Sequence, residues 1–170
     1  AQRFIKSGRQ ENSYSTLGKS NLTVSKIGFG SYRVHHALQD HRESLKFALL
    51  NGINLIDTSS NYTDGNSEIL IGEILHELIK QKQLSRSEIV IISKVGYIQG
   101  KNFNIVEERK RNSKPFPEIV EYSESCWHCI HPDFMKDQLE LSLQRLQLDR
   151  LDVYLLHNPE YFFLHAMKNE

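Results

Sequence analysis

Four residues that could act together on a small molecule stand at or just after the ends of short apolar runs. Asp57 closes the run INLID, Tyr62 follows it by five residues, Lys94 closes EIVIISK and His157 closes DVYLLH. In parallel α/β proteins the reactive groups lie just past the C-terminal ends of the strands, so these side chains are expected to converge on one rim. A single polar residue at the end of a strand usually marks only the point where the chain meets solvent. Asp, Tyr, Lys and His at three successive strand ends instead predict a reaction site.

The chemistry that this set favours is acid catalysis at a carbonyl group. A phenol is a poor proton donor at neutral pH unless a neighbouring ammonium stabilises its phenolate. Lys94 can supply that ammonium to Tyr62, and Asp57 can hold it in place. His157 offers a second donor that could orient a carbonyl oxygen. No nucleophile-and-base pair accompanies these residues, so they do not describe a hydrolase.

The segments that must position these residues alternate between strands and helices. Residues 17–22 (LGKSNL) are typical of a tight hairpin turn. Apolar spacing then predicts helices over 41–52, from Asn66 or Ser67 as the cap onward, and from Pro132 onward. Strands are predicted over 26–29, 53–57, 88–94 and 152–157. Four consecutive β-branched residues, 89–92, predict a strand buried on both faces, as in a parallel sheet.

This order predicts a parallel α/β sheet with right-handed crossovers. Two architectures fit, an open doubly wound sheet and part of a (β/α)8 barrel of the TIM type. A complete barrel takes about 250 residues. The 170 residues here have room for an N-terminal hairpin and about four βα units, the first half of such a barrel.

The chain divides into a short lead-in and one domain. Residues 1–13 are polar and aperiodic, so we expect a flexible lead-in, followed by the domain over 14–170. Within the domain, residues 95–131 are predicted to be a long, irregular loop insertion, either part of a substrate-binding wall or a variable surface segment. The charged run 107–114 is interpreted as a solvated loop.

Composition excludes several classes of protein. The chain has 21 Lys and Arg residues and 21 Asp and Glu residues, so it has no excess positive charge with which to bind nucleic acid. No apolar run approaches the roughly 20 residues that span a bilayer, so no membrane partner is expected. Two cysteines favour a reducing, cytoplasmic compartment.

The loop also carries CWHCIH, in which Cys126, Cys129 and His131 have the spacing of a metal or redox site. No second pair of ligands stands at a conventional distance, so no metal site is predicted. The favoured interpretation is a loop that packs Trp127 near the rim of the sheet.

Taken together, the sequence resembles the aldo-keto reductases. The matching pieces are LGKSNLTVSKIGFGS, GINLIDTSSNYTDGNSEILIG, ISKVG and LQLDRLDVYLLHNPE, within about residues 14–160. The family's Asp-x4-Tyr corresponds to Asp57 and Tyr62. Its Gly-x-Ser-Glu-x3-Gly pattern corresponds to Gly65, Ser67, Glu68 and Gly72.

The resemblance implies a (β/α)8 barrel closed at its bottom by the hairpin, and reduction of an aldehyde or ketone with NADP or NAD as cofactor, or oxidation of the alcohol. It makes Tyr62 the proton donor, tuned by Lys94 and Asp57, with His157 orienting the carbonyl. Gly30, Ser31 and Tyr32, together with Asp57, match residues that line the nicotinamide pocket, and Tyr32 could equally belong to a substrate loop.

The family's later strands, which carry most contacts to the dinucleotide, have no counterpart here, so the 170 residues alone are expected to be inactive. A regulatory subunit on the same fold, of the potassium-channel β-subunit type, and a metal or redox module built on CWHCIH are the alternatives. The partner is expected to be a small carbonyl compound or alcohol, and the oligomeric state is open.

Overall fold

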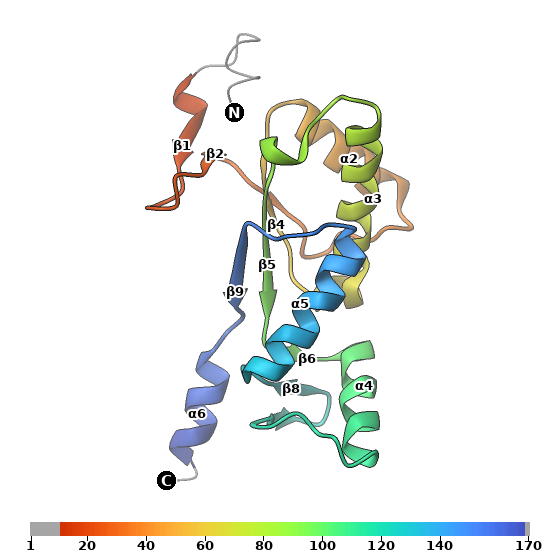
Figure 1. Ribbon diagram of the computed structural model, residues 1–170, viewed down its shortest axis with the longest axis vertical. Coiled ribbons are helices and arrows are strands. Elements are labelled where there is room, and N and C mark those ends of the chain that lie inside the picture. The colour runs from red at the N-terminus through yellow and green to blue at the C-terminus, as the bar shows by residue number, and fades with distance from the viewer. Residues whose placement is uncertain (1–10, 169–170) are drawn as a thin grey trace.

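A parallel sheet of four strands organises residues 11–168, the part of the chain that the computed structural model describes (Figure 1). Its order is β3 (Phe29–Gly30), β4 (Leu55–Asp57), β5 (Val90–Val95) and β9 (Val153–Leu156). Every neighbouring pair is parallel. The C-terminal ends of all four strands therefore meet at one edge, as the sequence predicted.

Helices connect these strands and cover one side of the sheet. Figure 1 shows α2 (Gln39–Leu50), α3 (Asn66–Lys80) and α5 (Pro132–Leu146) grouped on the same side of β4 and β5. Between them and the sheet lies an aliphatic core whose fully buried members include Leu45, Leu49, Ile56, Ile71, Ile74, Ile91 and Leu146. The final helix, α6 (Glu160–Lys168), follows β9.

The predicted hairpin is confirmed. β1 (Tyr14–Thr16) and β2 (Thr23–Ser25) pair antiparallel, preceded by the short 3-10 helix η1 (Glu11–Ser13). The hydroxyl of Tyr14 donates to the carbonyl of Gly52 at 2.8 Å, which ties the hairpin to the end of α2. Of the lead-in predicted for residues 1–13, the first ten lie outside the described residues.

The Gly-x-Ser-Glu-x3-Gly segment explains how α3 is fixed to its neighbours. Gly65, with φ of 85°, is the N-cap of α3 and closes the 3-10 turn η2 (Tyr62–Gly65). Asn66 and Ser67 are therefore helical residues rather than the predicted cap. The fully buried Glu68 accepts hydrogen bonds from Ser93 at 2.6 Å and from Arg145 Nε at 2.7 Å.

Gly72 lets α3 approach α5 closely, because a Cβ at this position would lie 2.6 Å from backbone atoms of Leu146. The motif therefore joins α3 to β5 and α5, and its role in this chain is one of packing.

The prediction of an irregular loop over residues 95–131 is wrong. This segment, which we call the insertion, contains β6 (Tyr97–Ile98), α4 (Gly100–Arg111), β7 (Val120–Ser123) and β8 (Cys126–His128). The strands form an antiparallel sheet in the order β6, β8, β7. The charged run 107–114, predicted to be loop, begins as the last turn and a half of α4.

The insertion has a core of its own, and this accounts for its order. Phe103 on α4 meets the ring of Trp127 with centroids 4.5 Å apart, and Phe116 meets Phe134 of α5 at 5.3 Å. Val106, one turn after Phe103, is also buried there. These apolar side chains offset the entropy cost of ordering a segment whose exposed residues are mostly polar or charged.

All four core strands differ from those predicted by one to three residues at one or both ends, and β3 and β5 show the differences that matter for the site. The first core strand consists only of Phe29 and Gly30, because Ile27 points outward and is 72% exposed. The third strand continues past Lys94 to Val95, and the amide of His157 donates to the Val95 carbonyl at 2.7 Å, one residue beyond β9. In residues 11–168 no helix combines the length and apolar character needed to cross a membrane.

Candidate active site

The ammonium of Lys94 is the centre of the site at the C-terminal edge of the sheet. Its Nζ donates to Asp57 Oδ1 at 2.6 Å, to the hydroxyl oxygen of Tyr62 at 3.0 Å and to the carbonyl of Thr58 at 2.9 Å. The Lys94 side chain is only 13% exposed, whereas the Asp57 carboxylate is 41% exposed. Lys94 thus lies between a carboxylate and a phenol, as the sequence analysis expected from strand order.

Tyr62 reaches this position through an unusual turn after β4. Its backbone amide donates to Ser59, and the next two residues, Thr63 and Asp64, have left-handed φ angles of 46° and 58°. The Thr63 hydroxyl donates to the carbonyl of Val34 at 2.6 Å, which anchors the turn. Left-handed non-glycine residues are uncommon and cluster at functional sites.

His157 lies edge-on to the ring of Tyr62, with centroids 5.8 Å apart. Burial, and next the nearby Lys94 ammonium, lower the pKa of His157 from its ordinary 6.5 to about 4. The imidazole is therefore neutral at physiological pH. Its Nδ1 lies 3.1 Å from the hydroxyl of Ser59, and its backbone carbonyl accepts a hydrogen bond from His128 Nε2.

Tyr62 and His157 line a pocket of about 270 Å³ at this edge of the sheet. Its other lining residues come from the loops after the strands, from the insertion and from α6, namely Tyr32, Asn61, Tyr97, Gln99, Cys126 and Tyr161. The structure therefore brings all four residues predicted to be catalytic together beside one pocket.

The sequence offered the insertion as a possible substrate-binding wall but did not identify Tyr97 or Gln99 as pocket residues. Tyr97, Gln99 and Cys126 reach the pocket because β6 pairs with β8 beside the end of β5. The spacing of Phe103 and Val106 was the one available signal that this segment is ordered. No motif marked Tyr97 or Gln99 as lining residues.

The residues predicted to contact a nicotinamide lie near the same edge, but not all of them face outward. Gly30 has open space where a Cβ would stand, and the exposed Tyr32 ring packs edge-on against Tyr62 at 5.1 Å. Ser31 differs, because it is fully buried; its hydroxyl donates to the Asp57 carbonyl at 2.8 Å and accepts from Ser67 at 2.7 Å. The Ser31 hydroxyl is thus bonded within the chain, and its place in a nicotinamide pocket stays a prediction.

The potential ligands of the CWHCIH segment point to different partners. The Cys126 sulfur accepts from Gln99, and the buried Cys129 thiol faces the carbonyl of Pro117 at 3.4 Å. His131 Nδ1 accepts from the Asp133 amide and caps α5. Among the residues that the structure describes, no three His, Cys, Asp or Glu side chains gather as a metal site would require.

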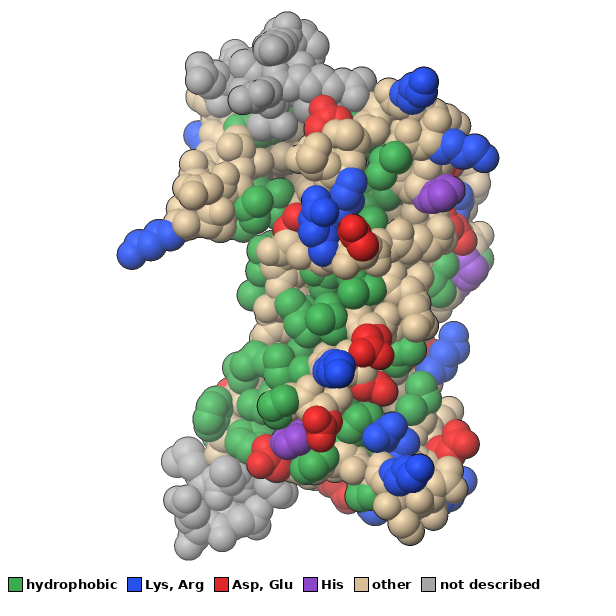
Figure 2. Space-filling model, in the orientation of Figure 1, with side chains coloured by type: hydrophobic (Ala, Val, Ile, Leu, Met, Phe, Trp, Pro, Cys, Tyr) green, Lys and Arg blue, Asp and Glu red, His purple; other side chains and the backbone are tan. Residues whose placement is uncertain are grey.

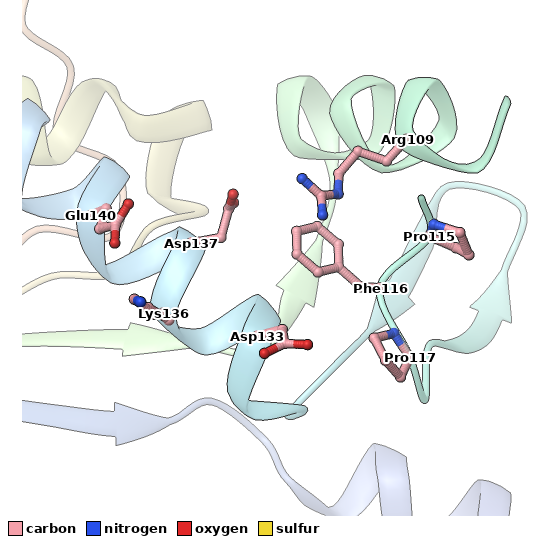
Figure 3. A pocket seen from close by; sticks show the side chains of 8 residues that line it. All are labelled: Arg109, Pro115, Phe116, Pro117, Asp133, Lys136, Asp137 and Glu140. Atoms are coloured by element: carbon pink, nitrogen blue, oxygen red, sulfur yellow. The ribbon is translucent and has the colours of Figure 1, made fainter. Parts of the chain in front are cut away.

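A second pocket, of about 300 Å³, lies between α4, residues 115–117 and α5 (Figure 3). The Arg109 guanidinium lies over the ring of Phe116, with Cζ 4.0 Å from the ring centroid, and Asp133 and Asp137 come from the facing helix. None of the four strand-end residues lines it, so it is separate from the candidate active site.

A parallel β/α sheet whose strand ends carry a phenol, an ammonium, a carboxylate and an imidazole is consistent with the first half of a (β/α)8 barrel. Comparison with known proteins gives the family. The model of the Aldo/keto reductase family matches residues 26–163, and the chain belongs to this family of oxidoreductases. The four parallel strands and the hairpin are accordingly part of a (β/α)8 barrel.

Individual relatives agree with this assignment. The chain is 28% identical over 152 residues to the NADH-specific methylglyoxal reductase of Escherichia coli (strain K12), covering 83% of this chain and 40% of that protein. It is 28% identical over 151 residues to "Probable aldo-keto reductase 1" of Glycine max, covering 85% and 36% respectively.

Among solved structures, the holo form of an aldo-keto reductase from Bacillus halodurans superposes with a TM-score of 0.64 at 25% identity. The match covers 92% of this chain and 45% of that one. The chain thus spans less than half the length of each of these three relatives.

Proposed function

We propose that this chain supplies the proton-donating side of an active site in which an aldehyde or ketone is reduced with NADH or NADPH. The observation that carries the proposal is the single Lys94 ammonium hydrogen-bonded to both Asp57 and the Tyr62 hydroxyl. Such a pairing stabilises the phenolate that remains once a tyrosine has given up its proton.

The residues at this edge fit the nicotinamide end of such a cofactor. The open space at Gly30 admits a close approach to the backbone, and the exposed ring of Tyr32 offers an apolar face. The partly exposed Asp57 carboxylate is an acceptor for hydroxyl or amide groups. When bound, the cofactor supplies the hydride, and Gly30, Tyr32 and Asp57 are the residues of this chain that would hold it.

Tyr62 is the proton donor in this proposal because it alone among the pocket tyrosines has the Lys94 ammonium beside its hydroxyl. Tyr97, another phenol in the pocket, differs in its surroundings. Burial, together with its contact with Tyr161, raises the pKa of Tyr97. A substrate oxygen placed in the pocket would receive its proton from Tyr62, and the negative charge left on that ring would lie beside Lys94.

His157 contributes orientation rather than a proton in this scheme. Its imidazole is neutral, because its pKa lies well below physiological pH. A neutral imidazole can hydrogen-bond to the substrate oxygen without transferring charge to it. The methylglyoxal reductase of Escherichia coli is a relative whose substrate is a small carbonyl compound, which supports this substrate class for the present chain.

The decisive experiment replaces Tyr62 with Phe in the full protein that carries this chain. Tyr62→Phe removes one proton donor and little binding surface, so the turnover of carbonyl reduction should fall by about 100-fold or more, the range for a lost general acid. Cofactor binding, measured by the quenching of NADPH fluorescence, should be nearly unchanged.

Tyr122→Phe is the matched control. Tyr122 is an exposed tyrosine on β7 and does not line the pocket. The control should retain the activity of the parent protein. Turnover close to that of the parent in Tyr62→Phe would show that another group donates the proton.

A further inference from the structure

A continuous row of hydrogen bonds leads from the imidazole of His157 to the thiol of Cys126. His157 Nδ1 lies 3.1 Å from Ser59 Oγ, and Ser59 Oγ lies 2.7 Å from Asn61 Oδ1. Asn61 Nδ2 is 3.1 Å from Gln99 Oε1, and Gln99 Nε2 is 3.2 Å from Cys126 Sγ. We call Ser59, Asn61 and Gln99 the relay.

The relay has a direction, because each member donates to the next. Asn61 donates to Gln99, and Gln99 donates to Cys126. The single proton of the Ser59 hydroxyl has two acceptors within reach, Asn61 Oδ1 at 2.7 Å and the Lys94 carbonyl at 3.4 Å, and the shorter contact is the one to Asn61. Ser59 can then only accept from His157, whose Nδ1 must carry the proton. In a neutral imidazole this leaves Nε2 without a proton, able to accept a hydrogen bond but not to donate one.

The same heavy-atom positions allow the opposite direction. A half-turn of both amide groups exchanges oxygen and nitrogen, which are nearly equal in size. Cys126 would then donate to Gln99, Gln99 to Asn61, Asn61 to Ser59, and Ser59 to Nδ1 of His157. The imidazole proton would reside on Nε2, which could then donate to a carbonyl oxygen in the pocket.

The two directions differ in what they require of the sulfur. A thiol can act as a weak donor or a weak acceptor, so it permits both directions. A thiolate or an S-alkylated sulfur has no proton to give and can serve only as the acceptor. Whether the sulfur of Cys126 carries a proton therefore influences which ring nitrogen of His157 is protonated.

We propose that Ser59, Asn61 and Gln99 are positioning residues that set the tautomer of His157 according to whether Cys126 can donate a hydrogen bond. An intact thiol permits the Nε2–H form, which binds a carbonyl oxygen. A blocked sulfur fixes the Nδ1–H form, which does not. The effect on carbonyl reduction rests on the proposed function, whereas the effect on the tautomer does not.

The arrangement of the two cysteines makes the proposal testable with a thiol reagent. Cys126 is partly exposed and lines the pocket, whereas Cys129 is fully buried. Methyl methanethiosulfonate should therefore react at Cys126 first. The sulfur of Cys126 displaces methanesulfinate and becomes a methyl disulfide, with no proton left on sulfur.

The experiment measures the protonated nitrogen of His157 by long-range nitrogen-15 NMR of the imidazole in the full protein. Blocking Cys126 should remove the Nε2–H population and leave Nδ1–H. In Ser59→Ala, and separately in Gln99→Met, the same modification should leave the tautomer of His157 unchanged, because the row of hydrogen bonds is interrupted. Cys126→Ser, which keeps a donor and loses the reactive sulfur, should show no response to the reagent.

Two results would overturn the proposal. One is an unchanged tautomer in the parent protein after Cys126 is blocked. The other is an equal change in Ser59→Ala and Gln99→Met, since the adduct would then act on the imidazole directly. The NMR measurement of the tautomer does not depend on enzyme activity. A protein that reduced no carbonyl compound but showed the tautomer change would therefore refute the proposed function without refuting the role of the relay.

Discussion

His128 Nε2 donates to the backbone carbonyl of His157 across 2.7 Å, and Gly96 provides the room for this contact. A Cβ on Gly96 would stand 2.4 Å from His128 Nε2 and 2.7 Å from the His157 carbonyl oxygen, and the φ of Gly96 is 153°. The bond joins the insertion to the end of β9. It therefore fixes the backbone of the residue that faces Tyr62.

Gly96→Ala should consequently disturb both stability and the site. The added methyl group would meet a ring nitrogen and a backbone oxygen, so the free energy of unfolding should fall by about 1–3 kcal/mol, the usual cost of overpacking. Urea denaturation checks this value. Gly30→Ala is the control for stability, because it would meet nothing within 4 Å and should change the free energy of unfolding by only a few tenths of a kcal/mol.

Lys94→Met should reduce turnover without unfolding the protein. Methionine keeps the apolar length of the side chain but removes the ammonium that faces Tyr62 and Asp57. We expect the rate of carbonyl reduction to fall by about 100-fold or more and the pH profile of the remaining rate to move. Lys110→Met, which removes an exposed lysine paired with Glu121, is the matched control. If the pH profile of Lys94→Met were the same as that of the parent protein, Lys94 would have no part in delivering the proton.

Mild acid should destabilise the fold through His157. Its pKa is about 4 in the folded chain and near the ordinary 6.5 in the unfolded chain, so between these values the unfolded chain binds more protons. The free energy of unfolding should therefore decrease as the pH is lowered from about 6.5 to about 4. His157→Gln should reduce this slope, measured by urea denaturation at several pH values. Part of it should remain, because burial also lowers the pKa of His128.

The 170 residues produced alone should associate with themselves and fail to bind the cofactor. Within the described residues β3 and β9 are the outer strands of the sheet, and on β9 Leu155 and Leu156 are 41% and 44% exposed. Figure 2 shows hydrophobic side chains gathered over β9 and α5. Unpaired strands with apolar faces favour association. Light scattering and NADPH titration test this, and a monomer that binds NADPH at micromolar concentration would contradict it.

The sequence was most informative where one physical rule governed a segment. The β-branched run in β5 and the polar residues that close β4 and β5 predicted a parallel sheet and the convergence of Asp57, Lys94 and Tyr62. These predictions needed only strand direction, because parallel strands place their C-terminal ends at the same edge. The structure confirms that geometry.

The rest depended on contacts between distant segments. The insertion is ordered because Phe103 packs against Trp127 and Phe116 packs against Phe134. The partners are distant in the sequence, so no local pattern predicts these pairs. The burial of Ser31 follows from the neighbouring Ser67 and Asp57. The helix cap at Gly65 replaces a side-chain cap with a left-handed backbone, which residue type alone leaves undecided.

The insertion's separate core divides the pocket between two parts of the molecule. Tyr62, Lys94 and Asp57 are held by the barrel strands and their loops, whereas Tyr97, Gln99 and Cys126 belong to the insertion, which packs on a second apolar cluster that includes Phe134 of α5. Substitutions in the wall supplied by the insertion can therefore reshape the pocket while Tyr62, Lys94 and Asp57 keep their places. In evolutionary terms, the insertion can vary with little effect on Tyr62, Lys94 and Asp57, but its contacts with His157 through His128 and the relay limit that freedom.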